Sequence, residues 1–318
     1  MTKILLLGAG FSKNWGGLLA DEVTEYLVQK LQSNPIIQKK LYNSKGFEDT
    51  YQDLLDEFVK SPTPENKSNF EAISVPVREI FSIMNKSFLK ISNFNFSQDA
   101  KKSIQNFLSR FDAIFTLNQD LLLEMHYMGN QFPLGGKQWD GAQLIGMYPK
   151  GDWRSNPLET LWMPTDFHSQ IQQHRFQPIY KLHGSVNWVG ENGVDSTMII
   201  GKDKFNQIGN SHVLRFLNGQ FFNIFHQKEV KLMMIGYGFG DDHINSMITS
   251  AYDNKPFEIH CINPDGKNSF LRVNNTANTG IYVPQAIEQI PIIWHTRNMS
   301  SIFDNDEIGF DKLNEFFN

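Results

Sequence analysis

The chain has 318 residues, of which 40% are hydrophobic and 20% are charged, and its formal net charge at pH 7 is −5. This composition supports a sizeable core and excludes global disorder, and the negative charge argues against a main role in neutralising nucleic-acid phosphates. The single cysteine, Cys261, excludes disulfides within the chain and any structural zinc site built from paired cysteines. We expect a cytoplasmic protein, because the first apolar run is too short for a signal peptide.

The N-terminal stretch MTKILLLGAGFSKNWGG contains a short apolar run, Ile4 to Leu7, that meets a glycine turn. A continuous apolar run bounded by glycine predicts a buried strand of a parallel sheet. Apolar residues then recur at helical spacing, which predicts a helix over 17–32. Residues 35–110 keep helical patterns, interrupted at Pro62 and Pro64. We interpret them as a helical insertion between the first and second strands.

Further along the chain, apolar runs repeatedly end in polar or glycine-rich tips. The runs lie in the segments 112–120, 178–189, 229–248, 257–265 and 287–296, and an amphipathic helix is expected over 303–318. This alternation predicts one α/β domain over 1–318, with a Rossmann-like, mostly parallel sheet covered by helices on both faces. The segment 132–157 is rich in Gly, Trp and Pro, and no element can be assigned to it. Because ligands of such sheets bind outside the carboxyl ends of the strands, the tips should converge there.

The first tip is a partial nucleotide-binding motif. In the dinucleotide fingerprint G-x-G-x-x-G, Gly8 and Gly10 match, but Lys13 stands in place of the third glycine. The acidic residue expected about 20 residues later has no counterpart, and no triphosphate loop is present. Gly10 would let the backbone approach a ligand, and Ser12 lies where a helix N-terminus would stabilise an anion. A plain strand–turn–helix connection remains an alternative.

The second and third tips carry polar side chains that suit catalysis. Thr116, Asn118 and Asp120 follow the second strand, although each of these residue types also caps helices. His183 follows a later strand and is followed by glycine, and histidine is the side chain best suited to general-base chemistry near neutral pH. A histidine with a purely structural role is the alternative.

The remaining tips offer backbone and polar contacts to a ligand. Gly236 and Gly238 belong to a strand-to-helix turn in which the backbone can reach phosphate or ribose. Asp241 in that turn is also a candidate helix cap. Asn263 opens the sequence Asn-Pro-Asp, which suits either ribose recognition or a β-turn.

The stretches GAGFS, TLNQD, KLHGSVNW, GYGFGDDHIN and INPD occur in this order between residues 8 and 265. Together they resemble the sirtuin-like (Sir2-like) NAD hydrolase domain of bacterial antiphage defence systems. The resemblance implies a single sirtuin-like domain over 1–318 that binds NAD beside a smaller helical module, with the insertion at 35–110. It also implies hydrolysis of NAD to ADP-ribose and nicotinamide. Sirtuin deacylases carry a zinc ribbon with two cysteine pairs, which this chain cannot form, so no metal is expected.

The resemblance assigns roles by position. Asn118 and His183 would be catalytic, with His183 as the base acting on the ribose hydroxyls. The NAD-binding residues would be Gly8, Ala9, Gly10, Phe11 and Ser12 at the pyrophosphate, Thr116 and Asp120 at the nicotinamide and its ribose, Gly236, Tyr237 and Gly238 along the adenosine, and Asn263 at the adenine ribose.

Other functions remain open at this level. The chain could sense NAD or ADP-ribose derivatives without turnover, or serve as a structural subunit of a defence complex, and protein deacylation is disfavoured by the missing cysteines. Because unregulated NAD hydrolysis is toxic, we expect control by homo-oligomerisation or by a separate sensor or regulatory protein. The Phe-rich helices of 47–111 are the candidate interface, and neither a membrane nor a nucleic acid is an expected partner.

Overall fold

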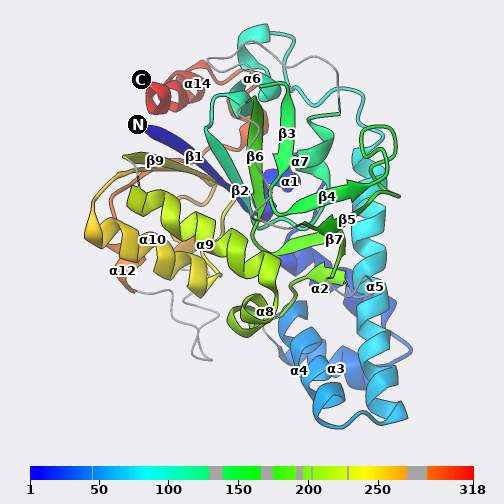
Figure 1. Ribbon diagram of the computed structural model, residues 1–318. Helices are drawn as coiled ribbons and strands as arrows, with labels where there is room; N and C mark the ends of the chain where they lie inside the picture. The colour runs from blue at the N-terminus through cyan, green and yellow to red at the C-terminus, as the bar shows by residue number, and fades with distance from the viewer. Residues whose placement is uncertain are drawn as a thin grey trace.

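The computed structural model describes residues 1–44, 46–128, 139–165, 175–190, 196–201, 203–227, 229–270 and 285–318. At its centre is a seven-stranded sheet whose strand pairs are all parallel (Figure 1). The sheet confirms the predicted Rossmann-like α/β fold. Its strands are β1 (Thr2–Leu7), β2 (Ala113–Thr116), β3 (Gly141–Leu144), β6 (Phe176–Lys181), β9 (Val230–Ile235), β10 (Glu258–Ile262) and β11 (Ile292–His295).

The order of the strands places β1 in the middle. The sheet runs β11-β10-β9-β1-β2-β6-β3, so the chain first builds outward from β1 through β2 and later returns to add β9 on its other side. Leu7, at the end of β1, is in register with Thr116 of β2 and with Ile235 of β9. The carboxyl ends of these three strands therefore meet at the point where the direction of building reverses, which is where open α/β sheets bind ligands.

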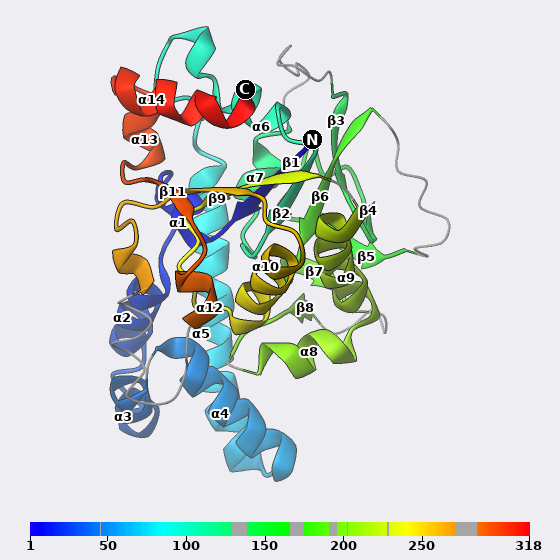
Figure 2. The same ribbon diagram turned by 90° about the vertical axis from the view of Figure 1, so that its left-hand side faces the viewer.

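Helices cover both faces of the sheet, which explains why the β1 run is apolar throughout. Figure 2 shows α9 (His212–Gln227) and α10 (Asp242–Asn254) on the opposite side from α1 (Ala9–Lys13) and α13 (Met299–Ile302). The predicted C-terminal helix is α14 (Glu307–Asn314), followed by η2 (Glu315–Phe317). The shorter helices are η1 (Ala100–Lys102), α6 (Ile104–Ser109), α7 (Leu122–Met125), α8 (Lys204–Asn210) and α12 (Gln285–Glu288).

Four helices between β1 and β2 form a module with a core of its own. They are α2 (Ala20–Lys30), α3 (Pro35–Asn43), α4 (Phe47–Lys60) and α5 (Pro64–Phe88), and α3 and α4 project from below the sheet in Figure 1. Most of their buried apolar residues form, together with Ile200, a cluster separate from the main core: Val23, Leu27, Leu31, Ile37, Leu41, Phe47, Leu54, Ile73, Val77 and Ile80. Met84 and Phe88 of α5 belong to the main core instead. No helix in the described part of the chain is both long and apolar enough to cross a bilayer.

The helix predicted over 17–32 begins later than expected. Gly16 has φ +89, and a Cβ on Gly17 would lie 2.7 Å from the backbone of Ser12. These two glycines separate α1 from α2, because a side chain would strain the first position and collide at the second.

A smaller four-stranded sheet was missed by the sequence interpretation. Its order is β4-β5-β7-β8, made of β4 (Met147–Lys150), β5 (Leu161–Pro164), β7 (Gly184–Val189) and β8 (Ser196–Met198). The segment left unassigned at 132–157 contributes β3 and β4, while its residues 132–138 lie outside the described part. Gly184 has φ +74, and a Cβ there would lie 1.9 Å from the Thr197 carbonyl oxygen. This turn between β6 and β7 fixes the position of His183.

Candidate functional site

Two glycine turns meet at the switch point between β1 and β9. Gly10 N donates to Gly236 O at 3.0 Å, and a Cβ on Gly236 would lie 2.3 Å from Gly10 C. The glycines are thus required for close contact between two loops. The backbone amides of Gly8 and Phe11 also donate to carbonyl oxygens of the protein. The solvent-exposed residues of these turns are Ala9, Gly238 and Gly240.

A buried chain of hydrogen bonds joins the first two predicted tips. Asn118 Nδ2 donates to Gly8 O at 3.0 Å and to Ser12 Oγ at 3.1 Å, and Ser12 Oγ donates to Asp120 Oδ2 at 2.8 Å. The backbone N of Asn118 donates to Thr116 Oγ1. We call Ser12, Asn118 and Asp120 the Asp120 network. Its direction is fixed, because both Asn118 amide hydrogens are used and the Ser12 hydroxyl has one proton to donate.

A buried ion pair, Lys181 with Glu124, is hydrogen-bonded to the backbone of the Asp120 network. Lys181 Nζ donates to the Asp120 carbonyl oxygen at 2.6 Å and to Glu124 Oε1 at 2.8 Å. Burial raises the pKa of Glu124, while the Lys181 charge acts to lower it. Asp120 Oδ1 also accepts from the backbone N of Leu122. The helix-cap interpretation does not hold for Asp120, because the N-cap of α7 is Leu121 and has no side-chain cap. One oxygen of Asp120 holds the turn before α7, and the other accepts from Ser12.

The third and fourth tips form a second polar group. The Nε2 atoms of His183 and His243 are 3.2 Å apart, and Asp241 Oδ1 lies 4.0 Å from His183 Nε2. Asp241 occupies the N-cap position of α10 but makes no side-chain cap; its carboxylate accepts from Lys204 Nζ at 2.7 Å. Lys204 also pairs with Glu48 of the helical module at 3.1 Å. We call His183, Asp241 and His243 the His183 cluster.

Burial and neighbouring charges set the protonation of the His183 cluster. Burial lowers the pKa of His183 to about 3, although the Asp241 charge opposes it. Burial also lowers the pKa of His243. For Asp241, burial raises the pKa, but Lys204 and the two histidines outweigh it and the pKa falls well below its usual value. At neutral pH the cluster therefore holds two neutral imidazoles, a carboxylate and an adjacent ammonium.

The two groups lie at the ends of neighbouring strands. Leu182 N donates to Thr116 O at 2.9 Å, and Ser185 Oγ donates to Gln119 O at 3.1 Å. The segment that follows β2 is thus hydrogen-bonded to the chain on both sides of His183, at Leu182 and at Ser185. The structure brings Asn118 and His183 to one edge of the sheet, as the sequence predicted.

Comparison with protein families gives one match. Residues 112–269 match the family model of the SIR2-like domain. The matched segment runs from the start of β2 to beyond β10 and contains Asn118, Asp120 and the whole His183 cluster. The match supports a Sir2-like domain and indicates an NAD-related function, compatible with an NAD-using enzyme. A search of curated proteins returned no match.

Two residues of the matched segment that were assigned to NAD hold turns together. Tyr237 is 2% exposed, and its hydroxyl donates to Asn245 Oδ1 at 2.7 Å. Asn263 Nδ2 donates to Tyr237 O, and its Oδ1 accepts from Asp265 N. The β-turn interpretation of Asn-Pro-Asp describes these contacts, and the roles of both residues in NAD binding remain predictions.

Lys204 and His243 were missed by the sequence interpretation. His243 lies within the quoted stretch GYGFGDDHIN, so its motif could have indicated it. Lys204 opens α8, where the sequence gives no comparable signal.

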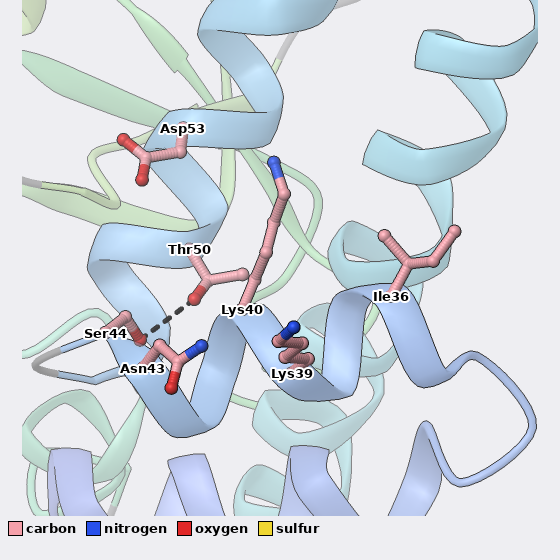
Figure 3. Close-up of a pocket in the computed structure, with 7 residues that line it drawn as sticks. All are labelled: Ile36, Lys39, Lys40, Asn43, Ser44, Thr50 and Asp53. Atoms are coloured by element: carbon pink, nitrogen blue, oxygen red, sulfur yellow. Dashed lines mark hydrogen bonds between the residues drawn. The ribbon is translucent and has the colours of Figure 1, made fainter.

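Two cavities in the described part of the chain lie away from the candidate site. The larger, about 430 Å³, is lined by residues of α3 and α4 and by Ser44, and Figure 3 shows the hydrogen bond from Thr50 to Ser44 between two of its lining residues. The smaller, about 240 Å³, lies near Met1 and Pro256. Neither is lined by a residue of the Asp120 network or the His183 cluster. The candidate site is therefore defined by the polar side chains that meet at the strand ends and not by the size of a cavity.

Proposed function

We propose that the protein is an NAD hydrolase that releases nicotinamide and leaves ADP-ribose. The observation that carries the proposal is the convergence of Asn118 and His183 at adjoining strand ends within the segment that matches the SIR2-like domain. NAD would lie across the switch point, with its pyrophosphate at the turn that exposes Ala9 and its adenosine along Gly238.

The reaction breaks the bond between the ribose anomeric carbon and the nicotinamide nitrogen. That nitrogen takes the bonding electron pair and loses its positive charge, so no acid is needed for departure. A water oxygen bonds to the anomeric carbon, and its proton passes through His183 to solvent. Asn118 would place the water or a ribose hydroxyl through its Oδ1, because its Nδ2 is held by Gly8 and Ser12.

The enzyme would act in antiphage defence by depleting NAD. This role follows from the resemblance of the motifs, and it requires that hydrolysis be restrained in the resting cell. We propose restraint by self-assembly or by a separate sensor protein. The Phe residues of α4 and α5 are buried or half-buried, whereas Val59, Val75 and Ile83 of the same helices are exposed. These three residues replace the Phe residues as the candidate contact surface.

The test is nicotinamide release from NAD by the purified chain, followed by chromatography. His183→Ala and Asn118→Ala should each lower the rate by about 10²–10⁴-fold, the usual contribution of a positioned catalytic group. His226→Ala is the matched control, because His226 is an exposed histidine on α9. Turnover by both site variants at the rate of the control would refute the assignment.

A binding module without turnover is the second candidate. His183 and Asn118 are only 3% and 8% exposed, which favours a role in holding a bound ligand over reaction with water. Calorimetric titration with NAD, with intact NAD recovered afterwards, would establish this alternative. Release of acyl-ADP-ribose from an acylated peptide would instead show a deacylase.

A further inference from the structure

The two histidines of the His183 cluster face each other through the same ring atom. Their Nε2 atoms are 3.2 Å apart. Two nitrogens bound to one tetrahedral zinc ion, at bond lengths of about 2.0–2.1 Å, lie about 3.4 Å apart. The pair is thus spaced as two ligands of one ion.

A third ligand of the right type is within reach. One ligand atom from each of His183, Asp241 and His243 lies within 4.8 Å of the others. A shift of about 1 Å would bring the carboxylate to coordinating distance. Lys204 holds this carboxylate, but Glu48 balances the ammonium. The carboxylates of Asp241 and Glu48 and the ammonium of Lys204 sum to a charge of −1, so a divalent cation is electrostatically acceptable.

We propose that the His183 cluster is a binding site for a divalent transition metal, namely Zn²⁺, with His183, His243 and Asp241 as ligands. Two imidazoles and one carboxylate are a ligand set that zinc accepts, with a fourth position left for water. One histidine must move its proton from Nε2 to Nδ1, so binding releases no proton from the rings. This proposal revises the expectation that the site holds no metal.

Zinc at this site would inhibit the enzyme. The Nε2 lone pair of His183 would be used in the metal bond and could no longer accept a proton from water. This consequence rests on the proposed NAD hydrolase function, whereas binding of the metal does not.

The direct test is titration of the metal-free chain with ZnCl₂ against a chromogenic chelator. We expect one tight Zn²⁺ per chain, at least tenfold weaker binding in His243→Ala and His183→Ala, and unchanged binding in the control His226→Ala. Circular dichroism checks that each variant is folded. Absence of tight binding to the wild type, or equal binding by His243→Ala, would overturn the proposal.

A second measurement separates this proposal from the proposed function. Zn²⁺ should abolish nicotinamide release by the wild type, and a chelator should restore it. Zinc binding in a chain that never turns over NAD would refute the hydrolase and leave the metal site intact. Full turnover with zinc at saturation would refute inhibition by the metal.

Discussion

The Asp120 network and the His183 cluster lie at adjoining strand ends, yet they are built differently. In the Asp120 network each donor has an acceptor, and the Lys181–Glu124 pair seals it from below. In the His183 cluster two imidazoles face each other, and the Asp241 carboxylate is half-buried beside them. The first arrangement stabilises the fold and orients Asn118, whereas the second brings two imidazoles and a carboxylate close enough to act on one ligand. Substitutions in the two groups should therefore have different consequences.

The largest loss of stability is expected below the Asp120 network. Lys181→Met leaves the Glu124 carboxylate buried without its cation, which should lower the free energy of unfolding by about 3–5 kcal/mol. Urea unfolding followed by circular dichroism measures the change. The double variant Lys181→Met/Glu124→Leu should recover most of it. A loss below about 1 kcal/mol in the single variant would show that the pair is not sealed from water.

The contact between the two glycine turns comes next. Gly236→Ala places a Cβ 2.3 Å from the Gly10 backbone at a residue with φ +62, and we expect a loss of about 3 kcal/mol. The control is Gly219→Ala on α9, where an added Cβ meets no atom within 4 Å. That variant should gain up to about 1 kcal/mol from helix propensity. If Gly236→Ala and Gly219→Ala change the unfolding temperature equally, the turns that contain Gly10 and Gly236 can move apart without loss of stability.

A pH effect of intermediate size is expected at His126, which packs against Phe11 beside the Asp120 network. Its ring nitrogens have no hydrogen-bond partner in the described part of the chain, and burial lowers its pKa from 6.5 to about 3. Because the folded pKa is lowered, the unfolded chain takes up the proton first. The stabilisation is complete above pH 6.5 and is lost as the pH falls toward 3.

The variant His126→Phe isolates this effect. Between pH 7 and pH 5, wild type should lose about 2 kcal/mol more stability than the variant, since each pKa unit corresponds to about 1.4 kcal/mol. Urea unfolding at the two pH values gives the difference. If the free energy of unfolding falls equally in both proteins, the protonated His126 ring must gain a hydrogen-bond partner or contact with solvent in the folded state.

The smallest effect is expected from the hydroxyl at the centre of the Asp120 network. Ser12→Ala removes the donor to Asp120 and the acceptor of Asn118, which should cost about 1–2 kcal/mol of stability. Ser87→Ala is the control, since that hydroxyl is exposed and bonds only its own helix; it should change stability by less than about 0.5 kcal/mol. If the two substitutions change the free energy of unfolding equally, the hydrogen bonds of Ser12 within the Asp120 network do not stabilise the fold.

Six strands of the main sheet could be predicted from the sequence, because the central ones are buried on both faces. The edge strand β3 lies in the segment to which no element was assigned. Ile4–Leu7 and Leu232–Ile235 are apolar runs that end at glycines, and this pattern can be recognised without knowing the partner strand. The convergence of Asn118 and His183 followed from the rule for parallel strands. The smaller sheet could not be predicted in this way, because β4 and β5 are short, partly exposed and rich in Trp and Pro.

The same reasoning could not find the partners of the site residues. The ion pair of Lys204 with Asp241 joins α8 to the turn before α10, and nothing local to either segment indicates it. Gly10 of the first turn was interpreted as letting the backbone approach a ligand, whereas in the structure its missing side chain makes room for Gly236. A glycine signals a close approach, but only the tertiary fold identifies what approaches.

The pairing of β1 with β9 bears on how the protein is made in the cell. Thr2 lies beside Val230, so the central strand leaves the ribosome long before one of its two neighbours is synthesised. At about 5–20 residues per second, the delay is on the order of ten seconds or more. During translation the nascent chain has an open edge on β1 and lacks Asp241 and His243. β1 therefore gains its neighbour β9 late in synthesis. The His183 cluster can form only after Asp241 and His243 have emerged from the ribosome.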